Sequence, residues 1–287
     1  MSLHKFRKGI ALPIGGKPSQ EIEQAVPCQQ VAVLATDSVG LRPKMHVSVG
    51  DDVRRGQLLF EDKSTPGVRY TSPAEGTVVD IHRGDRRALQ SLVIKLSRAE
   101  REGRGPDEVS FRAFTGRHPS GLSSDDVRDL LVESGMWVSL RARPFGRVAH
   151  PETRPHSIFV TAIDTQPLAP SFDRVVTDID AFERGLAALC RLTDGPVYVC
   201  TAPETDIRIS VSDQLRHEQF SGPHPAGTVG LHIHTLDPVN RHKTTWNIGA
   251  QDVTAIGKLF KSGGLEVTRV ISLGGPPVRR PRLLQTR

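Results

Sequence analysis

The sequence is poor in cysteine and in aromatic residues, and it contains no long apolar stretch. Its three cysteines, Cys28, Cys190 and Cys200, are widely spaced and form no CxxC pair. This spacing argues against a disulfide framework and against an iron–sulfur cluster or structural zinc held by cysteine alone. The best apolar run, Ser157–Ile163, is far shorter than the roughly 18 residues of a membrane-span candidate. The first residues also lack the apolar core of a signal peptide, so we expect a cytoplasmic chain.

Charge is not concentrated either. The 38 basic and 32 acidic side chains give a net charge of +6, and aromatic residues make up 5% of the chain. A nucleic-acid-binding protein is expected to cluster both kinds of residue, so no nucleic-acid partner is predicted. The exception is the final stretch VRRPRLLQTR, where Arg279, Arg280 and Arg282 could meet an acidic partner or lipid headgroups. The simpler interpretation of that stretch is a solvated loop.

What is present fits a globular protein of about two domains. Hydrophobic residues make up 37% of the 287 residues, and there are 26 glycines besides. That composition is near the globular average, and the length suggests roughly two domains of 100–200 residues each. We divide the chain into an N-terminal segment (1–30), a small β domain (31–97), a linker (98–120) and an α/β domain (121–287).

The β domain is predicted from short strands separated by glycine turns. The stretches VSVGDDVRRGQLLFED and SPAEGTVVDIHRG alternate apolar and polar residues and carry turns at Gly50-Asp51 and Arg83-Gly84-Asp85. Glycine adopts the positive φ of hairpin turns without steric cost. The two stretches look like the half-motifs of the biotinyl/lipoyl-type barrel-sandwich hybrid.

That likeness raises the question whether Lys63 carries a swinging cofactor. In lipoyl domains the modified lysine lies at the tip of a tight hairpin, beside an acidic residue. Lys63 follows Glu61-Asp62 at the right distance, but Ser64-Thr65-Pro66-Gly67 lengthens the connection. A plain surface lysine is the favoured interpretation, and a lipoyl-like carrier domain stays open as an alternative.

The second half has the rhythm of a parallel α/β domain. Ser123-Ser124-Asp125-Asp126 predicts a helix start, because it combines hydroxyl caps with carboxylates in the first turn. Apolar strands without alternation are typical of a sheet that is buried on both faces. A Rossmann-like fold is therefore predicted. The expected strands are 158–163, 197–201, 207–211 and 267–273, and the expected helices are 181–192 and 251–261.

The glycine-rich cradle that such folds use to bind nucleotides is missing. Dinucleotide sites need glycines between strand and helix, so that the backbone can approach a pyrophosphate. Ile163 is followed by Asp164-Thr165-Gln166-Pro167-Leu168, and Leu273 by Gly274-Gly275-Pro276-Pro277, where the prolines remove N–H donors. No GxxxxGK[ST] motif occurs. A site for NADH or FMN on this chain is not predicted.

Three histidines are weak candidates for a site. His232 and His234 are two residues apart, and on a strand they would share one face, as in some metal sites. A zinc-dependent enzyme would then need a third ligand such as His224 or Asp237. The simpler interpretation is that Pro223 and its neighbours shape a turn whose histidines bond backbone carbonyls.

Several ordered blocks carry a closer likeness. They are the segment Val31–Ile94, then SGMWVSLRARPF, IFVTAIDTQPLA, GPHPAGTVGLHIHTLDPV, QDVTAIGKLF and SLGGPPVRRPRLL. In this order they resemble the A-subunit family of Na+-translocating NADH:quinone oxidoreductases, from Lys8-Gly9 to Leu284. Members of that family continue well past this end, so we expect an N-terminal fragment without the C-terminal region. More distant similarity links the fold to one component of the Rnf electron-transport complex, which is an alternative identity, and to the flavoprotein subunit of respiratory complex I.

The resemblance implies a function that the chain performs with partners. The family's complex is a translocase that oxidises NADH, reduces ubiquinone to ubiquinol and pumps Na+ out of the cell. The resemblance implies five other subunits, which carry FAD, FMN and an iron–sulfur centre. This chain would be peripheral, on the cytoplasmic side of the bacterial inner membrane. An assembly or quinone-side role without its own cofactor is expected, and the isolated chain is expected to be inactive.

If the chain contacts quinone, the loops at the carboxyl ends of the parallel strands are the expected place. These loops are predicted to begin at Asp164 and Gly274. A quinone headgroup needs an apolar slot with one or two hydrogen-bond donors for its carbonyls. His224 is the candidate donor, because its proline and glycine neighbours hold it outside regular structure. The favoured interpretation is that His224 only braces a turn, since turn histidines commonly bond backbone groups.

Overall fold

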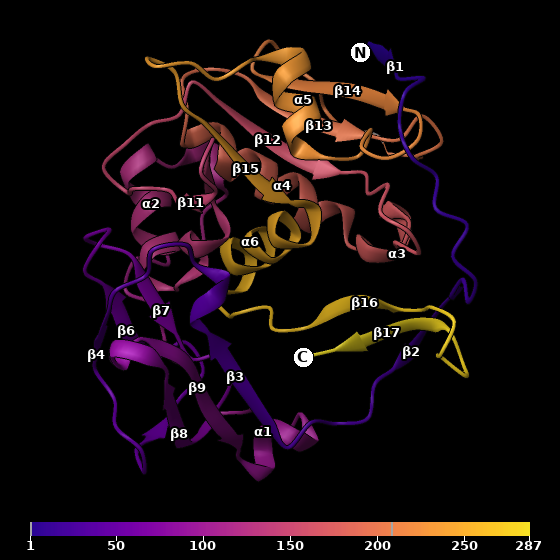
Figure 1. Cartoon of the computed structure of the whole chain (residues 1–287). Coiled ribbons are helices and arrows are strands. Elements are labelled where there is room, and N and C mark those ends of the chain that lie inside the picture. Colours follow the sequence, from indigo (N-terminus) through magenta and orange to yellow (C-terminus); the bar gives the residue numbers. More distant parts are fainter. Residues whose placement is uncertain (1, 208) are drawn as a thin grey trace.

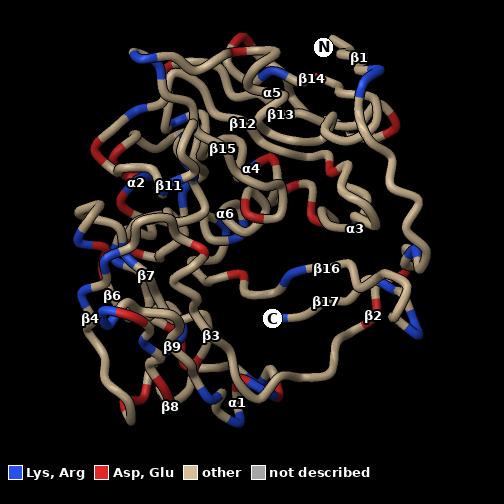
Figure 2. The backbone as a smooth tube through the Cα atoms, viewed as in Figure 1, with Lys and Arg blue, Asp and Glu red and all other residues tan. Residues whose placement is uncertain are grey.

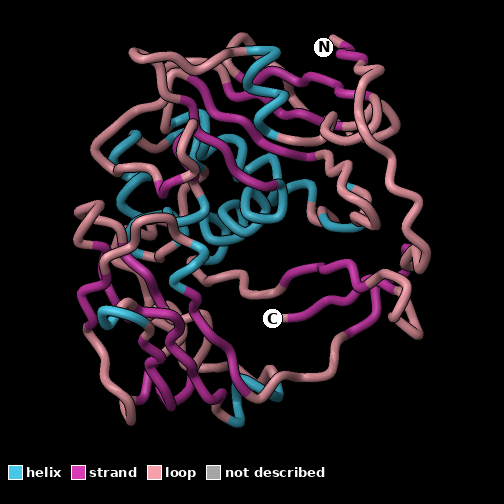
Figure 3. The backbone as a smooth tube through the Cα atoms, in the orientation of Figure 1, coloured by secondary structure: helices cyan, strands magenta, loops and turns pink. Residues whose placement is uncertain are grey.

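A computed structural model describes residues 2–207 and 209–287. It has three parts: a β domain, a large mixed sheet with its helices, and a small sheet that closes the side between them (Figure 1). The helices gather against the large sheet, whereas the β domain is built almost wholly of strands (Figure 3). One continuous hydrophobic core joins the β domain to the large sheet, from Val47 and Val53 through Phe111 to Phe260.

The β domain consists of two facing antiparallel sheets. Inward-facing residues such as Phe60, Val78 and Ile94 are fully buried, as period-two alternation demands. Gly50 and Gly56 have φ angles of 98° and 81°, as predicted for glycine turns. The first sheet has the order β3 (Gln30–Leu34), β9 (Leu89–Leu96), β8 (Gly76–Arg83), β5 (Asp52–Val53), and the second has β4 (Pro43–Met45), β6 (Leu58–Asp62), β7 (Arg69–Thr71).

The large sheet has seven strands: the first five are parallel to one another, the sixth is antiparallel to the fifth, and the seventh is antiparallel to the sixth. Its order is β1 (Leu3–Lys5), β14 (Leu215–Ser221), β13 (Val197–Thr201), β12 (Ser157–Ala162), β15 (Thr245–Gly249), β10 (Arg141–Arg143), β11 (Arg147–Val148). Both of its faces are covered. Ile158 and Val160 pack into the core shared with helices α4 (Ile179–Arg191) and α6 (Ala250–Ser262). Phe159 and Tyr198 pack in a second cluster with Ile233 of helix α5 (Val229–Leu236). The absence of alternation in β12 and β13 follows from this double burial.

The three helices that the sequence predicts begin within two residues of the expected positions. Helix α2 (Ser124–Glu133) has a capping box between Ser123 and Asp126. Helices α4 (Ile179–Arg191) and α6 (Ala250–Ser262) cross in close contact. The backbones approach so closely that a Cβ added to Gly257 would lie 1.6 Å from the Ala181 carbonyl oxygen. The remaining helices are α1 (Arg98–Glu102), α3 (Phe172–Val175) and α5 (Val229–Leu236). Among the residues that the structure describes, no helix is both long and apolar enough to cross a membrane.

The small sheet corrects two predictions. Strand β16 (Arg269–Leu273) does not join the parallel sheet, so the loop at Gly274 does not follow a strand of that sheet. Instead β16 pairs antiparallel with β17 (Arg282–Thr286), which in turn pairs parallel with β2 (Ser19–Gln24). The end of the chain is therefore a paired strand from Arg282 onward and not a loop. Pairing between segments some 260 residues apart leaves no local signal in the sequence.

Two further differences concern the edge of the large sheet. A strand was predicted over Ile207–Val211, but residues 207 and 209–211 form none, and Arg208 lies outside the described residues. The strand beside β13 is β14, a few residues later. The N-terminal segment, for which no strand was predicted, contributes β1 to this edge and β2 to the small sheet.

Candidate ligand cleft at the carboxyl edge of the sheet

The carboxyl ends of β12 and β15 open into a cleft of ≈ 510 Å³. Its lining combines an apolar surface with separate polar groups, which is the usual character of a small-molecule site. The apolar part comprises Ala162, Ile163, Pro170, Phe172, Val175, Val229 and Ala250. The polar part includes Thr161, Asp164, Gln166, Thr228, Gln251, Asp252 and Arg269.

Arg269 is the cationic group of the cleft, and β16 brings it there. Its Nη2 lies 2.8 Å from Oδ1 of Asp252, in the first turn of α6, and its Nη1 donates to the Thr268 carbonyl. Gln251 fixes β16 beside the helix, because its amide exchanges two hydrogen bonds with the backbone of Val270. A partly exposed guanidinium with further N–H groups can donate to an oxygen of a bound ligand.

A second cavity of ≈ 450 Å³ lies on the other side of the loop that follows β12. Ile163, Asp164 and Phe172 line both cavities. The loop between them is held in place by one local and one long-range hydrogen bond: the carboxylate of Asp164 accepts the Gln166 N–H at 2.8 Å, and Ser272 of β16 donates to the Leu168 carbonyl at 2.5 Å. The loop that separates the two cavities, residues 163–168, is therefore fixed in place, and we call it the wall.

His224 lies behind this wall and is not among the residues that line either cavity. Its Nδ1 is 3.1 Å from the hydroxyl of Thr165, and the same hydroxyl accepts the Gly227 N–H at 2.9 Å. Its carbonyl accepts the N–H of Ile10. These contacts are those of a residue that braces a turn beside the cleft.

The expected strand face for His232 and His234 is wrong. Both lie on helix α5, where residues two apart point in nearly opposite directions. His234 is exposed, whereas His232 is fully buried, with its Nε2 2.9 Å from the Ala226 carbonyl. Burial lowers the pKa of His232 to about 4, so its ring is neutral at pH 7.

Asp237, the other proposed third ligand, is occupied elsewhere. Its carboxylate accepts a hydrogen bond from Ser157 at 2.6 Å and contacts His156 at 2.8 Å and Lys243. Burial raises the pKa of this carboxyl, but those partners outweigh it, so the pKa lies below its ordinary value. Across residues 2–207 and 209–287 no group of three or more histidine, cysteine, aspartate or glutamate side chains could hold a metal ion.

Lys63 is exposed in the connection between β6 and β7. This connection spans residues 63–68, longer than the two-residue turn of a tight hairpin. The carboxylate of Asp62 accepts the N–H groups of Arg42 and Ser64, both at 2.9 Å. The acidic neighbour of Lys63 therefore organises the loop, and the lysine is not at a hairpin apex.

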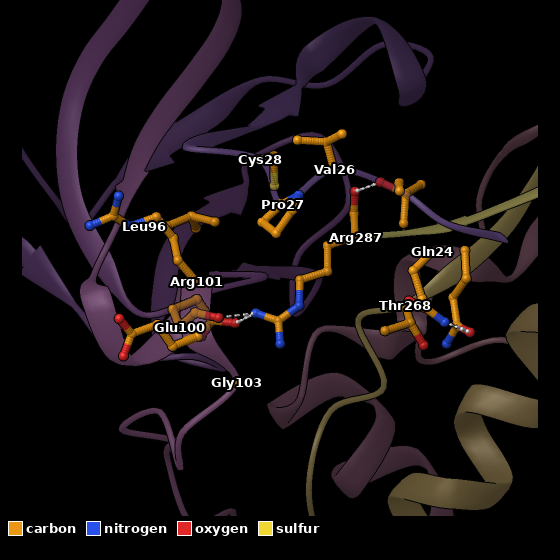
Figure 4. A pocket seen from close by; sticks show the side chains of 14 residues that line it. Gln24, Val26, Pro27, Cys28, Leu96, Glu100, Arg101, Gly103, Thr268 and Arg287 are labelled. Atoms are coloured by element: carbon orange, nitrogen blue, oxygen red, sulfur yellow. Dashed lines mark hydrogen bonds and ion pairs between the residues drawn. The ribbon is translucent and has the colours of Figure 1, made fainter.

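A third pocket, of ≈ 280 Å³, lies between α1, the segment 24–28 that joins β2 to β3, and the end of β17 (Figure 4). Its charged centre is Glu100, whose side chain is fully buried. One carboxylate oxygen contacts the guanidinium groups of Arg55, at 2.6 Å, and Arg287, and the other accepts the Glu75 N–H at 2.9 Å. Because both oxygens of the Glu100 carboxylate already have partners, we assign this pocket a structural role.

The place of Arg269 in the cleft could not be found from the sequence. The sequence pattern places Arg269 in a strand of the main sheet, whereas the side chain reaches the cleft from the small sheet. The one usable signal was general: the carboxyl edge of a parallel sheet is the usual ligand position, and the loop from Asp164 is indeed there.

Comparison with known proteins gives two family matches in the same order. The NqrA N-terminal barrel-sandwich hybrid domain matches residues 4–97, and the NqrA second alpha/beta domain matches residues 122–265. Curated relatives match over nearly the whole chain. The A subunit of the Na(+)-translocating NADH-quinone reductase of Alcanivorax borkumensis is 50% identical over 284 residues, which is 99% of this chain and 62% of the relative.

The corresponding protein of Marinomonas sp. is 49% identical over 285 residues, and that of Cellvibrio japonicus is 47% identical over 284 residues. In each case 99% of this chain and 62% of the relative are covered, so the chain spans less than two thirds of these relatives' length. The two domain matches together include most of the β domain and the large sheet. The chain belongs to the NqrA family.

Proposed function

We propose that this chain is the N-terminal part of the NqrA component of a Na+-translocating NADH-quinone reductase and that it serves the quinone side of that complex. It would act as a peripheral subunit on the cytoplasmic face of the inner membrane, bound to five other subunits. The names of its relatives support the complex. The cleft beside Arg269 supports the quinone side.

The observation that carries the quinone-side role is the composition of the cleft. A quinone headgroup is a flat apolar ring with two carbonyl oxygens, and it needs an apolar slot with a few donors. Ile163, Phe172 and Val175 supply apolar surface, and Arg269 and Gln166 supply N–H groups at the same cleft. Bound here, the ring would pack on the apolar residues while a guanidinium N–H donates to one carbonyl.

The same cleft is poorly suited to a phosphate-bearing cofactor. Asp164 caps the loop after β12 with its own carboxylate, and Asp252 occupies the first turn of α6. Carboxylates at those places take the N–H groups and the positive end of the helix dipole that a phosphate would use. The parallel strand order supports a Rossmann-like ancestry. Its nucleotide site would have been lost, and the flavins and iron–sulfur centre would belong to other subunits.

Co-purification tests the proposal. The chain, extended to the full length of its relatives, should co-purify with the other subunits as a stoichiometric complex. Purified alone, it should be colourless and should not oxidise NADH. A stoichiometric flavin spectrum of the isolated chain, or a complex that assembles and reduces ubiquinone normally without it, would contradict the proposal.

A further inference from the structure

The N-terminal segment carries a row of exposed apolar side chains that is not part of the cleft. Residues 7–15 are all exposed, and they run along one edge of the molecule between β1 and β2 (Figure 1). We call residues 7–18 the strap. Ile10, Leu12 and Ile14 alternate along it and are 66%, 57% and 40% exposed. Large aliphatic side chains in a row are unusual on a free surface.

The strap is fixed to the protein at both ends. At its start the N–H of Ile10 donates to the His224 carbonyl at 2.8 Å, and a Cβ on Gly9 would lie 2.3 Å from that oxygen. At its end the Gly16 carbonyl accepts the Gly275 N–H at 3.0 Å, and Pro18 is buried. The aliphatic row is therefore presented by a held segment, not by a loose tail.

Basic side chains flank the row. Arg7, Lys8 and Lys17 lie on the strap itself, and residues 2–20 contain no acidic residue. The loop between β16 and β17 meets the strap at Gly16 and adds the exposed Arg279. Figure 2 shows these positive segments at both ends of the strap and on that loop.

We infer that the strap and the adjoining loop form a surface that binds an anionic lipid bilayer. An apolar row between basic residues matches both attractions that hold a protein at such a bilayer: insertion of apolar side chains and attraction to anionic headgroups. The row consists of three large aliphatic side chains, far less surface than a stable protein interface needs, which buries about 800 Å² on each partner. The inference does not depend on the proposed role of the cleft.

Vesicle binding by the 287-residue chain tests the inference. The probes are vesicles of 30% phosphatidylglycerol in phosphatidylethanolamine and vesicles of phosphatidylcholine alone, at 50 mM salt. The chain should sediment with the anionic vesicles at least tenfold more strongly than with the neutral ones. Raising the salt to 500 mM should remove most of the binding, because headgroup attraction is screened.

Two matched double variants assign the binding to the strap. Ile10→Ser with Leu12→Ser should weaken binding about tenfold, whereas Val39→Ser with Val49→Ser, at positions each 57% exposed, should leave it unchanged. All four positions are exposed, so circular dichroism should show both variants folded. No binding to anionic vesicles, or equal binding by the two variants, would overturn the inference. Normal vesicle binding by the strap variant together with failed complex assembly would instead assign the strap to a protein partner.

Discussion

Two polar-lined pockets of this molecule differ in whether their charges already have partners. In the Glu100 pocket one buried carboxylate is shared by Arg55, Arg287 and the Glu75 N–H. In the cleft, Arg269 makes one ion pair and remains partly open to solvent beside apolar residues. The first arrangement holds elements of the chain together, and the second leaves donors for a ligand. Changes in the first should therefore alter stability, and changes in the second should alter ligand binding.

The largest expected effect is on the Glu100 pocket. Glu100→Ala leaves Arg55 and Arg287 without their shared carboxylate, and breaking such a buried set typically costs about 3–5 kcal/mol. We expect that loss in the free energy of unfolding, measured by urea denaturation. The control is Glu102→Ala, whose partly exposed side chain pairs with Arg98 and should cost about 0.5 kcal/mol. Equal losses of unfolding free energy in the two variants would contradict a special structural role for the Glu100 pocket.

The next effect concerns the turn at Ala226 beside the cleft, whose carbonyl the neutral ring of His232 contacts. Its pKa is about 4 in the fold and 6.5 ordinarily, mainly because of burial. The unfolded chain therefore binds the extra proton first, and stability falls as the pH drops from 6.5 towards 4. The loss at pH 4 should be about 3 kcal/mol.

His232→Gln isolates this contribution, because its amide can still donate to the carbonyl but does not titrate. Urea denaturation at pH 7 and pH 4 should show a smaller acid loss for His232→Gln than for the wild-type chain, by about 3 kcal/mol. Parallel pH profiles would mean that the pKa of His232 is the same in the folded and the unfolded chain.

A smaller effect is expected for His224→Ala. This change removes the hydrogen bond to Thr165, so about 1 kcal/mol of stability should be lost. Assembled into the complex, the variant should keep the wild-type ubiquinone KM and kcat, with at most a lower yield. A raised KM at normal yield would restore His224 as a quinone contact and shift the site to the far side of the wall.

The two domains also differ in how far the sequence could predict them. The β domain follows from local signals, since Gly50 and Gly56 mark turns and the strands between them alternate. In the large sheet β12, α4 and β13 were predicted nearly to the residue. The histidine pair was misread because HIH alternates like a strand, and short apolar runs are ambiguous between strand and helix.

What the sequence could not show is pairing over long distances. Strands β2 and β17 come from opposite ends of the chain, and their pairing helps to hold β16, and with it Arg269, at the mouth of the cleft. Neither β2 nor β17 has a sequence periodicity that indicates this pairing. The location of the cleft could therefore be predicted, but its cationic donor could not.

The most direct test of the comparison is the ubiquinone KM of the assembled complex carrying Arg269→Gln. Losing a charged donor to a quinone carbonyl should raise this KM about tenfold, with little change in unfolding free energy. The matched control is Arg280→Gln, which removes an exposed guanidinium paired with Glu23 on the same small sheet and should leave the KM unchanged. An unchanged KM in Arg269→Gln, or an equal rise in both variants, would contradict a quinone-side role for the cleft.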